Sequence, residues 1–305
     1  MDAASANPPS PLPCWPRLGA GLSYQGALRT FVRDHLDAFD FLEIIPDIFW
    51  TDEEGASEGA RFRENAEAVR FLDTVAECRP LVAHSVGLSI GSAERLDRLY
   101  IEQLARWQAR YHFPWMSEHL AFTRLPGAAQ KDLDLGVMLP LPFDEDTLAL
   151  LSERVAALRT AVPVPFLLEN NVSYIAFAEQ DLDEPTFLNR LARESGCGLL
   201  LDLHNLYTNA RNHGHDPRRF LADLDLTRVV EIHIGGGLEW EGVYLDAHSG
   251  PCPEEVWTLL DEVLPATPHL GGVVFEMFGN YFREVGPQVL AAELGRLRAV
   301  LDRRG

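Results

Sequence analysis

Residues that commonly bind metals recur at the ends of apolar segments in this sequence. In six places, an apolar run ends directly in an Asp, Glu or His side chain. Such a group at the edge of an apolar core is costly unless it is solvated, paired or bound to a metal. Six repeats of one pattern suggest one shared site. The six residues are His84, Glu118, Glu169, Asp202, His233 and Glu276.

These side chains offer imidazole and carboxylate ligands without a thiolate, and two more candidates, Asp246 and His248, follow the seventh apolar run. That donor set suits iron, manganese, cobalt or zinc. Without a metal, so many crowded carboxylates would repel one another and raise one another's pKa. Any one of these residues could instead be a hydrogen-bonded rim residue or, like Asp202, a helix cap. The metal hypothesis therefore depends on their coincidence across six segments.

Eight apolar runs with β-strand character would bring these residues together. The runs are continuously apolar rather than alternating, which favours parallel strands buried on both faces. They lie near residues 18–22, 40–45, 80–85, 114–117, 165–168, 198–203, 229–234 and 272–276.

Segments with helical periodicity lie between the runs, and Ser92 and Asp144 are plausible N-caps. Thr123–Leu141 and Asp181–Glu184 are expected to be longer loops at the rim. The predicted helices cover Arg61–Glu77, Ala93–Arg110, Asp144–Val162, Glu184–Ser195, Pro253–Leu264 and Pro287–Leu301.

Strands that alternate with helices over this length predict an α/β fold of the (β/α)8 TIM-barrel type, as a single domain over residues 17–305. The Pro- and Ala-rich residues 1–16 are expected to be a disordered lead-in. A doubly wound open sheet is the competing fold, but Gly19–Ser23 matches its glycine-rich phosphate turn only weakly. In a barrel the carboxyl ends of the strands meet at one face, where the six residues would converge.

The composition limits the classes of function. The 305 residues include 46 acidic and 26 basic side chains, for a formal net charge of −20. This charge argues against a nucleic-acid partner and could attract a cation or a basic peptide, although most of it can serve solubility alone. No apolar run is long enough to cross a bilayer, and the N-terminus lacks signal-peptide features, so a cytoplasmic location is expected. The four scattered cysteines indicate neither a disulfide framework nor a zinc ribbon.

Seven short motifs, in order along the chain, carry a resemblance to a known family. They are His84–Ser92, Ser117–Ala121, Leu168–Asn170, Leu199–Tyr207, Asn212–Gly214, Glu231–His233 and Asp246–His248. Over roughly residues 17–300, the chain resembles the multinuclear non-heme iron-dependent oxidative enzymes of the MbnB- and TglH-like family.

The resemblance implies a TIM barrel that holds two or three irons, in a mixed-valent Fe(II)/Fe(III) state, at its C-terminal face. Family members use dioxygen as a co-substrate to modify a residue, most often Cys and otherwise Asn or Asp, of a ribosomally made precursor peptide. Many work with a small partner protein that presents the precursor. By motif matching, the implied ligands are His84, Glu118, Asp202, Asn205, His233, Asp246, His248 and Glu276.

Glu118, Asp202 and His233 are the expected catalytic residues, with Glu118 as the bridging carboxylate. His119 should point to the opposite face of its strand and act from behind the ligands. The other residues expected to contact substrate or to support the ligands are Asp47, Glu169, Asn170 and His204.

The sequence departs from the family pattern in three places. Asp47-Ile48 stands where members commonly have Glu-Asn, and His204-Asn205 stands where many have Asn-Asn. Gly235–Gly237 stands where many have a second His. These changes leave the third iron and the substrate residue open.

Two alternatives to an oxidative enzyme remain. One is a redox-neutral sugar isomerase or hydrolase with one or two metal ions on the same barrel. The other is a non-enzymatic peptide- or metal-binding protein. For an oxidative enzyme, we expect a basic leader segment of the peptide to dock near Asp132, Asp134 and Glu239.

Overall fold

Eight parallel strands close into a barrel in the computed structural model, which describes residues 15–53, 61–93, 96–125, 133–175, 177 and 180–303. Each predicted strand is present within about two residues of its expected position, and the closed sheet rules out the doubly wound alternative. The TIM-barrel prediction is therefore confirmed. In barrel order the strands are β1 (Gly19–Tyr24), β14 (Gly272–Glu276), β11 (Val229–Gly235), β10 (Gly198–Asp202), β9 (Phe166–Glu169), β6 (Met116–His119), β5 (Leu81–Ser85) and β2 (Phe41–Ile44).

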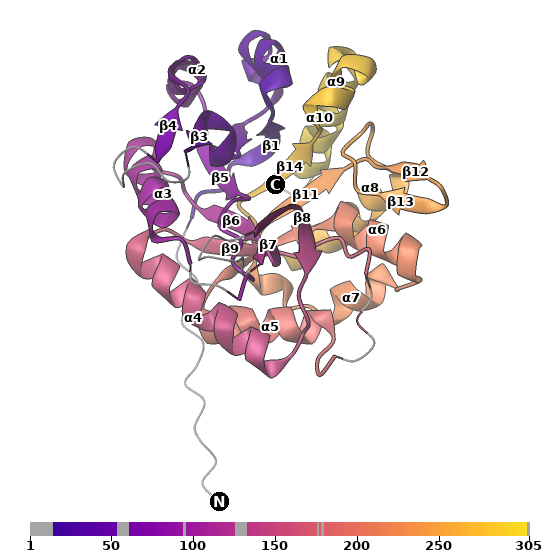
Figure 1. The fold of residues 1–305 in the computed structure, drawn as a ribbon. Helices are drawn as coiled ribbons and strands as arrows, with labels where there is room; N and C mark the ends of the chain where they lie inside the picture. Colours follow the sequence, from indigo (N-terminus) through magenta and orange to yellow (C-terminus); the bar gives the residue numbers. More distant parts are fainter. Residues whose placement is uncertain are drawn as a thin grey trace, which may run out of the picture.

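Helices surround the barrel, and Figure 1 shows them as an outer ring. The sequence predicts six of them and misses the short helices α1, α7 and α9 and the helix α6 that directly follows β10. They are α1 (Arg29–Asp34), α2 (Ala66–Ala76), α3 (Arg98–Tyr111), α4 (Glu145–Ala161), α5 (Glu184–Ser195), α6 (Leu203–His213), α7 (Pro217–Asp223), α8 (Glu254–Val263), α9 (Gly279–Val285) and α10 (Pro287–Asp302).

Two predicted helix starts are wrong. Helix α2 begins after Asn65, whose side chain accepts hydrogen bonds from the first turn, rather than at Arg61. Helix α3 begins after Asp97, whose carboxylate caps it, while Ser92 donates to the Arg124 carbonyl instead of acting as the cap. In both cases an Asn or Asp side chain further along the chain than the predicted start satisfies the free N–H groups of the first turn. The predicted cap Asp144 of α4 is confirmed.

Among the described residues, three short hairpins lie outside the barrel sheet. They are β3 (Trp50–Asp52) with β4 (Phe62–Glu64), β7 (Ala121–Leu125) with β8 (Leu133–Pro140), and β12 (Leu238–Trp240) with β13 (Val243–Leu245). The β7–β8 hairpin corrects the expected loop over Thr123–Leu141, because those residues pair as antiparallel strands.

An apolar layer fills the barrel at the end away from the candidate site. Its buried members are Phe41, Val82, Trp115, Leu167, Leu200, Val230 and Val274. Trp15 and Leu18 pack against this layer, and the Trp15 indole N–H donates to the His269 carbonyl at 2.6 Å. Residues 1–14, which make up most of the expected lead-in, lie outside the described residues. No helix in the described ranges is both long and apolar enough to cross a membrane.

Two glycines on the neighbouring strands β1 and β14 make room for the Phe41 ring of this layer. A Cβ added at Gly21 would lie 2.4 Å from the Phe41 ring, and one at Gly272 would lie 2.5 Å from it. The ring is fully buried, so it has no solvent into which to move.

We predict that Gly21→Val lowers the free energy of unfolding by about 1–3 kcal/mol, because the added side chain overpacks the Phe41 site. Gly26→Ala is the matched control, since no atom lies within 4 Å of its added Cβ, and its effect should stay within about 0.5 kcal/mol. Urea denaturation followed by circular dichroism measures both. Equal stability of the two variants would contradict the tight packing.

Candidate metal centre

The candidate site is the layer of inward-pointing side chains directly above the apolar layer. Side chains two residues apart on a strand point to the same face, and in five pairs an apolar residue of the layer is followed by a polar one at the next inward position. The pairs are Phe41 with Glu43, Val82 with His84, Leu167 with Glu169, Leu200 with Asp202 and Val274 with Glu276. Strand geometry alone therefore gathers these polar groups at the C-terminal end of the barrel.

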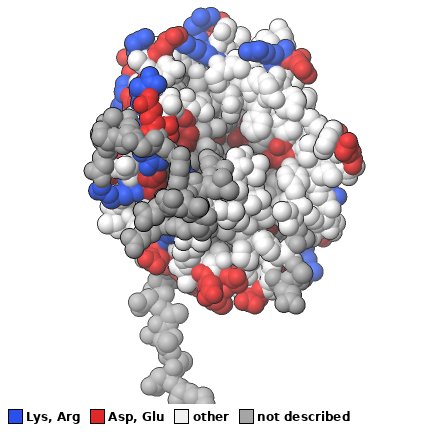
Figure 2. All heavy atoms as spheres, in the orientation of Figure 1, with Lys and Arg blue, Asp and Glu red and all other residues white. Residues whose placement is uncertain are grey.

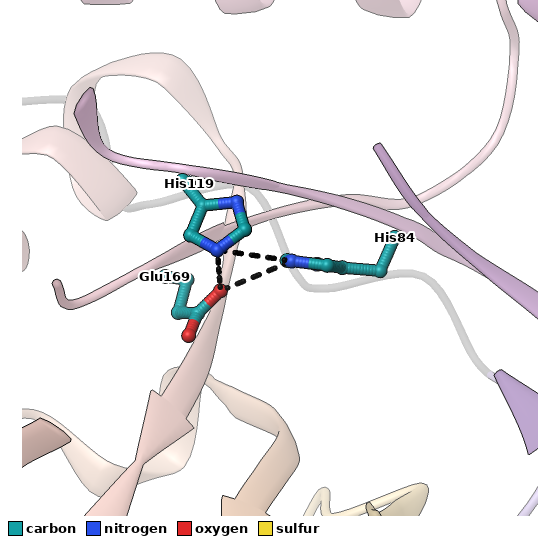
Figure 3. Close-up of side chains that lie close together, drawn as sticks. All are labelled: His84, His119 and Glu169. Carbon is teal, nitrogen blue, oxygen red and sulfur yellow. Dashed lines mark hydrogen bonds and ion pairs between the residues drawn. The ribbon is translucent and has the colours of Figure 1, made fainter. Parts of the chain in front are cut away.

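The first ligand group consists of His84, His119 and Glu169, whose nearest ligand atoms lie within 4.8 Å of one another. Figure 3 shows the three side chains pointing toward a common point. His84 Nε2 lies 3.3 Å from His119 Nε2 and 3.4 Å from Glu169 Oε2. The other ring nitrogen of His84 contacts Ser117 Oγ at 2.9 Å, which turns Nε2 toward this point.

A second group, Glu169, Asp202 and His233, meets the same distance limit and shares Glu169 with the first. Glu169 Oε1 accepts a hydrogen bond from Asn205 Nδ2 at 3.1 Å, while Oε2 has no hydrogen-bond partner in the described part of the chain. The carboxylate of Glu169 is therefore fixed between the two groups, where it could bridge two cations.

Asp246, His248 and Glu276 line the side of the second group. His248 Nε2 lies 3.0 Å from Asp246 Oδ1, and its Nδ1 lies 3.4 Å from Glu276 Oε2. The φ angle of His248 is 44°, which is uncommon for a residue other than glycine and is often found at functional sites. Asp246 also accepts from His204 Nδ1 at 2.8 Å, so His204 supports this side from behind.

Two asparagines hold the second group in place. The side chain of Asn170 forms two hydrogen bonds with the backbone of Asp202. Its Nδ2 donates to the Asp202 carbonyl at 2.9 Å, and its Oδ1 accepts from the Asp202 N–H at 2.8 Å. Asp202 also caps α6, since its Oδ1 accepts from the Asn205 N–H at 2.8 Å. Asn205 Oδ1 is buried and without a hydrogen-bond partner in the described ranges, which leaves it available as a ligand.

Glu118 is placed differently from the expectation. Trp115, Ser117 and His119 occupy alternate positions of β6 and its start, so Glu118 points to the opposite face of the strand. Its carboxylate accepts hydrogen bonds from Ser85 Oγ at 2.8 Å and from the Leu88 N–H at 3.3 Å. The predicted orientations of Glu118 and His119 are thus reversed, and Glu118 lies outside both ligand groups.

Asp47 lies in the cavity wall, away from the ligand groups. Its carboxylate accepts from the Tyr100 hydroxyl at 2.8 Å and from the Val86 N–H at 3.2 Å. Among the residues expected to dock a leader segment, Glu239 pairs with Arg211 at 2.7 Å. Asp132 and the side chain of Asp134 lie outside the described residues.

Sequence reasoning missed two acidic residues of the site layer. Glu43 in β2 and Glu231 in β11 are both fully buried below the two ligand groups, and a carboxylate oxygen of each lies within 4.8 Å of a His233 ring nitrogen. A signal was present, because each is a carboxylate inside an otherwise apolar strand segment, Phe-Leu-Glu-Ile and Val-Val-Glu-Ile. The prediction considered only the residues at strand ends and therefore did not include these two glutamates.

The electrostatics of the site are those of a cation-binding centre. Within the described residues, the ion pairs of Glu43, Glu169, Asp246 and Glu276 are all with histidines. Burial raises the pKa of Glu169, and burial with the nearby Asp246 raises the pKa of Asp202 to about 6. Both carboxylates thus lack a positive neighbour strong enough to offset desolvation.

The imidazoles respond to burial in two ways. Burial lowers the pKa of His84, and lowers that of His119 to about 4, so both are neutral and able to act as ligands near pH 7. Burial also opposes the charge of His248, but Asp246 and Glu276 raise its pKa to about 10. His248 would have to lose this proton before it could bind a metal.

Several buried polar atoms of the site lack hydrogen-bond partners in the part of the chain that is described. Buried polar groups are rarely left in this state, so a bound group is the simplest explanation. The imidazole and carboxylate donors fit a transition-metal ion. The atoms are Glu169 Oε2, Asn205 Oδ1, His119 Nδ1, His233 Nδ1 and His248 Nδ1.

A cavity of about 820 Å³ opens above the ligand groups. His84, His119 and Glu169 contribute to its lining, and β8 forms part of its wall with exposed Val137 and Met138. On the face drawn in Figure 2, the arginine side chains of the described residues lie toward the periphery. The site is therefore open to a ligand much larger than water.

Comparison with known sequences connects this geometry to one family. Residues 19–302 match the family described as RiPP precursor modification enzyme MbnB/TglH/ChrH. Curated relatives include a UPF0276 protein of Caulobacter vibrioides, 33% identical over 76% of this chain and 77% of its own length. Another, from Bordetella pertussis, is 36% identical over 72% of this chain and 75% of its own length.

Comparison with solved structures supports the fold. Endonuclease IV from Thermus thermophilus superimposes with a TM-score of 0.56 at 19% identity, covering 94% of this chain and 100% of the other. D-psicose 3-epimerase from Clostridium cellulolyticum superimposes with a TM-score of 0.54 at 14% identity, covering 93% and 97%. At these identities the likeness concerns the barrel alone.

We predict that His119→Ala weakens metal binding at least about tenfold, because it removes an imidazole from the first ligand group. Glu118→Gln is the matched control from the next position of the strand, and it should bind metal like the parent. Metal content after dialysis, measured by mass spectrometry of the element, compares the two. Loss of metal in Glu118→Gln with retention of metal in His119→Ala would contradict this geometry and would support Glu118, as expected from the sequence, as the ligand.

Proposed function

The chain belongs to the MbnB/TglH/ChrH family of enzymes that modify precursors of ribosomally synthesised peptides, and on that premise we propose that it is an iron-dependent oxidative enzyme acting on such a peptide. The observation that carries the proposal is the pair of ligand groups joined by Glu169. One catalytic ion needs three or four protein ligands, and this site offers more.

The ligand groups assign roles to the residues. His84, His119 and Glu169 would hold one ion, and Glu169, Asp202 and His233 would hold a second. The family resemblance and the unpartnered atoms support four further ligands for two or three ions. These are Asn205, Asp246, His248 and Glu276.

When bound, iron would supply the oxidation with dioxygen as co-substrate, and the protein groups would orient the reactants. The chain's own contribution is rigidity: Ser117 turns His84, Asn205 holds Glu169, and Asn170 clamps Asp202. Ligands fixed in this way keep their geometry as substrate and ions exchange.

The cavity supports a peptide residue as the substrate. Its volume of about 820 Å³ lies toward the upper end of the range of about 300–1,000 Å³ for ligand sites, which leaves room for a side chain together with flanking peptide backbone. Its wall includes the half-exposed apolar side chains of Met138, Tyr174 and Phe278, which could contact flanking peptide residues. Cys is our first choice for the modified residue, with Asn or Asp next, and a small presenting protein is a candidate partner.

We predict that the purified protein contains more than one iron atom per chain after expression in iron-replete medium, since a single ion would leave many buried ligands unpaired. Elemental analysis combined with Mössbauer spectroscopy measures iron content and valence. Manganese-supplemented expression provides the control for non-selective loading. One zinc ion and no iron per chain would favour a redox-neutral isomerase or hydrolase.

We predict that co-expression with a short Cys- or Asn-containing peptide encoded beside its gene changes the mass of that peptide. The same experiment with Glu169→Gln should leave the mass unchanged, because the carboxylate that both ligand groups share is lost. Tandem mass spectrometry locates the changed residue. An unmodified peptide, with the presenting protein included and iron loaded, would argue against this function.

A further inference from the structure

Below the two ligand groups, a carboxylate from the opposite side of the barrel contacts His233. Glu43 Oε2 of β2 lies 3.0 Å from His233 Nε2 of β11, and both side chains are fully buried. Strands β2 and β11 are not neighbours in the sheet, because β1 and β14 lie between them. The contact therefore spans the interior of the barrel.

The other nitrogen of the His233 ring faces the acidic side of the site. Nδ1 lies 3.3 Å from Glu276 Oε2 and has no hydrogen-bond partner among the residues described. If Nε2 carries the hydrogen donated to Glu43, Nδ1 presents its lone pair, because a neutral imidazole has one donor and one acceptor nitrogen.

We propose that Glu43 is a positioning residue that fixes the tautomer and orientation of His233, so that Nδ1 of His233 binds the metal shared with Glu169 and Asp202. This inference rests on the metal centre of the proposed function. A carboxylate behind a metal-binding histidine also increases the basicity of the ring, and removing such a partner typically costs about 10–100-fold in metal affinity.

Glu231 provides a contrast within the same layer. Its Oε2 accepts a hydrogen bond from the Trp115 indole N–H at 2.9 Å rather than from His233. It is as deeply buried as Glu43, and it lies on the same strand as His233. Glu231→Gln thus replaces an equally buried carboxyl group of the same layer without removing a hydrogen bond to the His233 ring.

Glu43, Glu231 and His233 could themselves hold a cation, since their ligand atoms lie within 4.8 Å of one another and Oε1 of each glutamate lacks a hydrogen-bond partner in the described ranges. Such an ion would use His233 Nε2, which Glu43 already contacts at 3.0 Å. It would also rest directly on the apolar layer that contains Phe41 and Trp115. These two points favour positioning over a separate deep ion.

The test is titration of the metal-free full-length protein with Co²⁺, followed by the visible absorption bands that report the ligands around cobalt. In Glu43→Gln, we expect an unchanged number of bound ions, at least about tenfold weaker binding and shifted bands. Glu43→Asp retains the negative charge and should recover part of the affinity. Glu231→Gln should remain within about threefold of the parent with the parent's bands.

Circular dichroism establishes that each variant is folded. If Glu43→Gln does not fold, Glu43→Asp replaces it in the test, and we expect this variant to bind cobalt more weakly than the parent. Parent-like affinity and bands in the folded Glu43 variants would overturn the inference while leaving the metal centre intact. Loss of one whole ion in both Glu43→Gln and Glu231→Gln would also overturn it, in favour of a deep cation site. A parent that binds neither cobalt nor iron would overturn the proposed function and this inference together.

Discussion

The structure depends on the cost of removing carboxylates and imidazoles from water inside a barrel. The effective penalty is several kcal/mol for each buried ion, and opposite charge at close range must offset it. In the described part of the chain, that charge comes from histidines, which can be neutral, rather than from Lys or Arg. Bound cations would replace this weak compensation with a strong one, so metal binding at the candidate groups would also stabilise the fold.

The alternation of side chains along each strand organises this chemistry into layers. An apolar layer that includes Phe41 and Trp115 seals one end, and the next inward position on β2, β5, β6, β9, β10 and β14 carries a candidate ligand or a residue that supports one. Residues behind the ligands then fix their directions, as Ser117 does for His84 and Asn170 does for Asp202. The same period of two thus produces both the stable core and the reactive surface above it.

Much of the architecture is predictable from local patterns, because continuously apolar runs mark parallel strands and their polar ends mark the C-terminal face. Local patterns do not show which face of a strand points into the barrel. The predicted directions of the Glu118 and His119 side chains are therefore the reverse of those observed. Local patterns also do not reveal Glu43, whose partner His233 lies across the barrel. The predicted start of α3 is wrong because Asp97 caps the helix, while the equally suitable Ser92 donates its hydroxyl to the Arg124 carbonyl.

The glycines after β11 explain one departure from the family pattern. A Cβ at Gly236 would lie 2.4 Å from the Pro251 carbonyl oxygen, and one at Gly237 would lie 2.2 Å from the Leu245 carbonyl oxygen. No side chain fits there, because the segment that carries Asp246 and His248 packs against this end of the strand. A Cβ at Gly235 would lie only 3.1 Å from His248 Nδ1. His248 therefore occupies the space beside β11 that a side chain at Gly235 would need, and the strand ends in glycines.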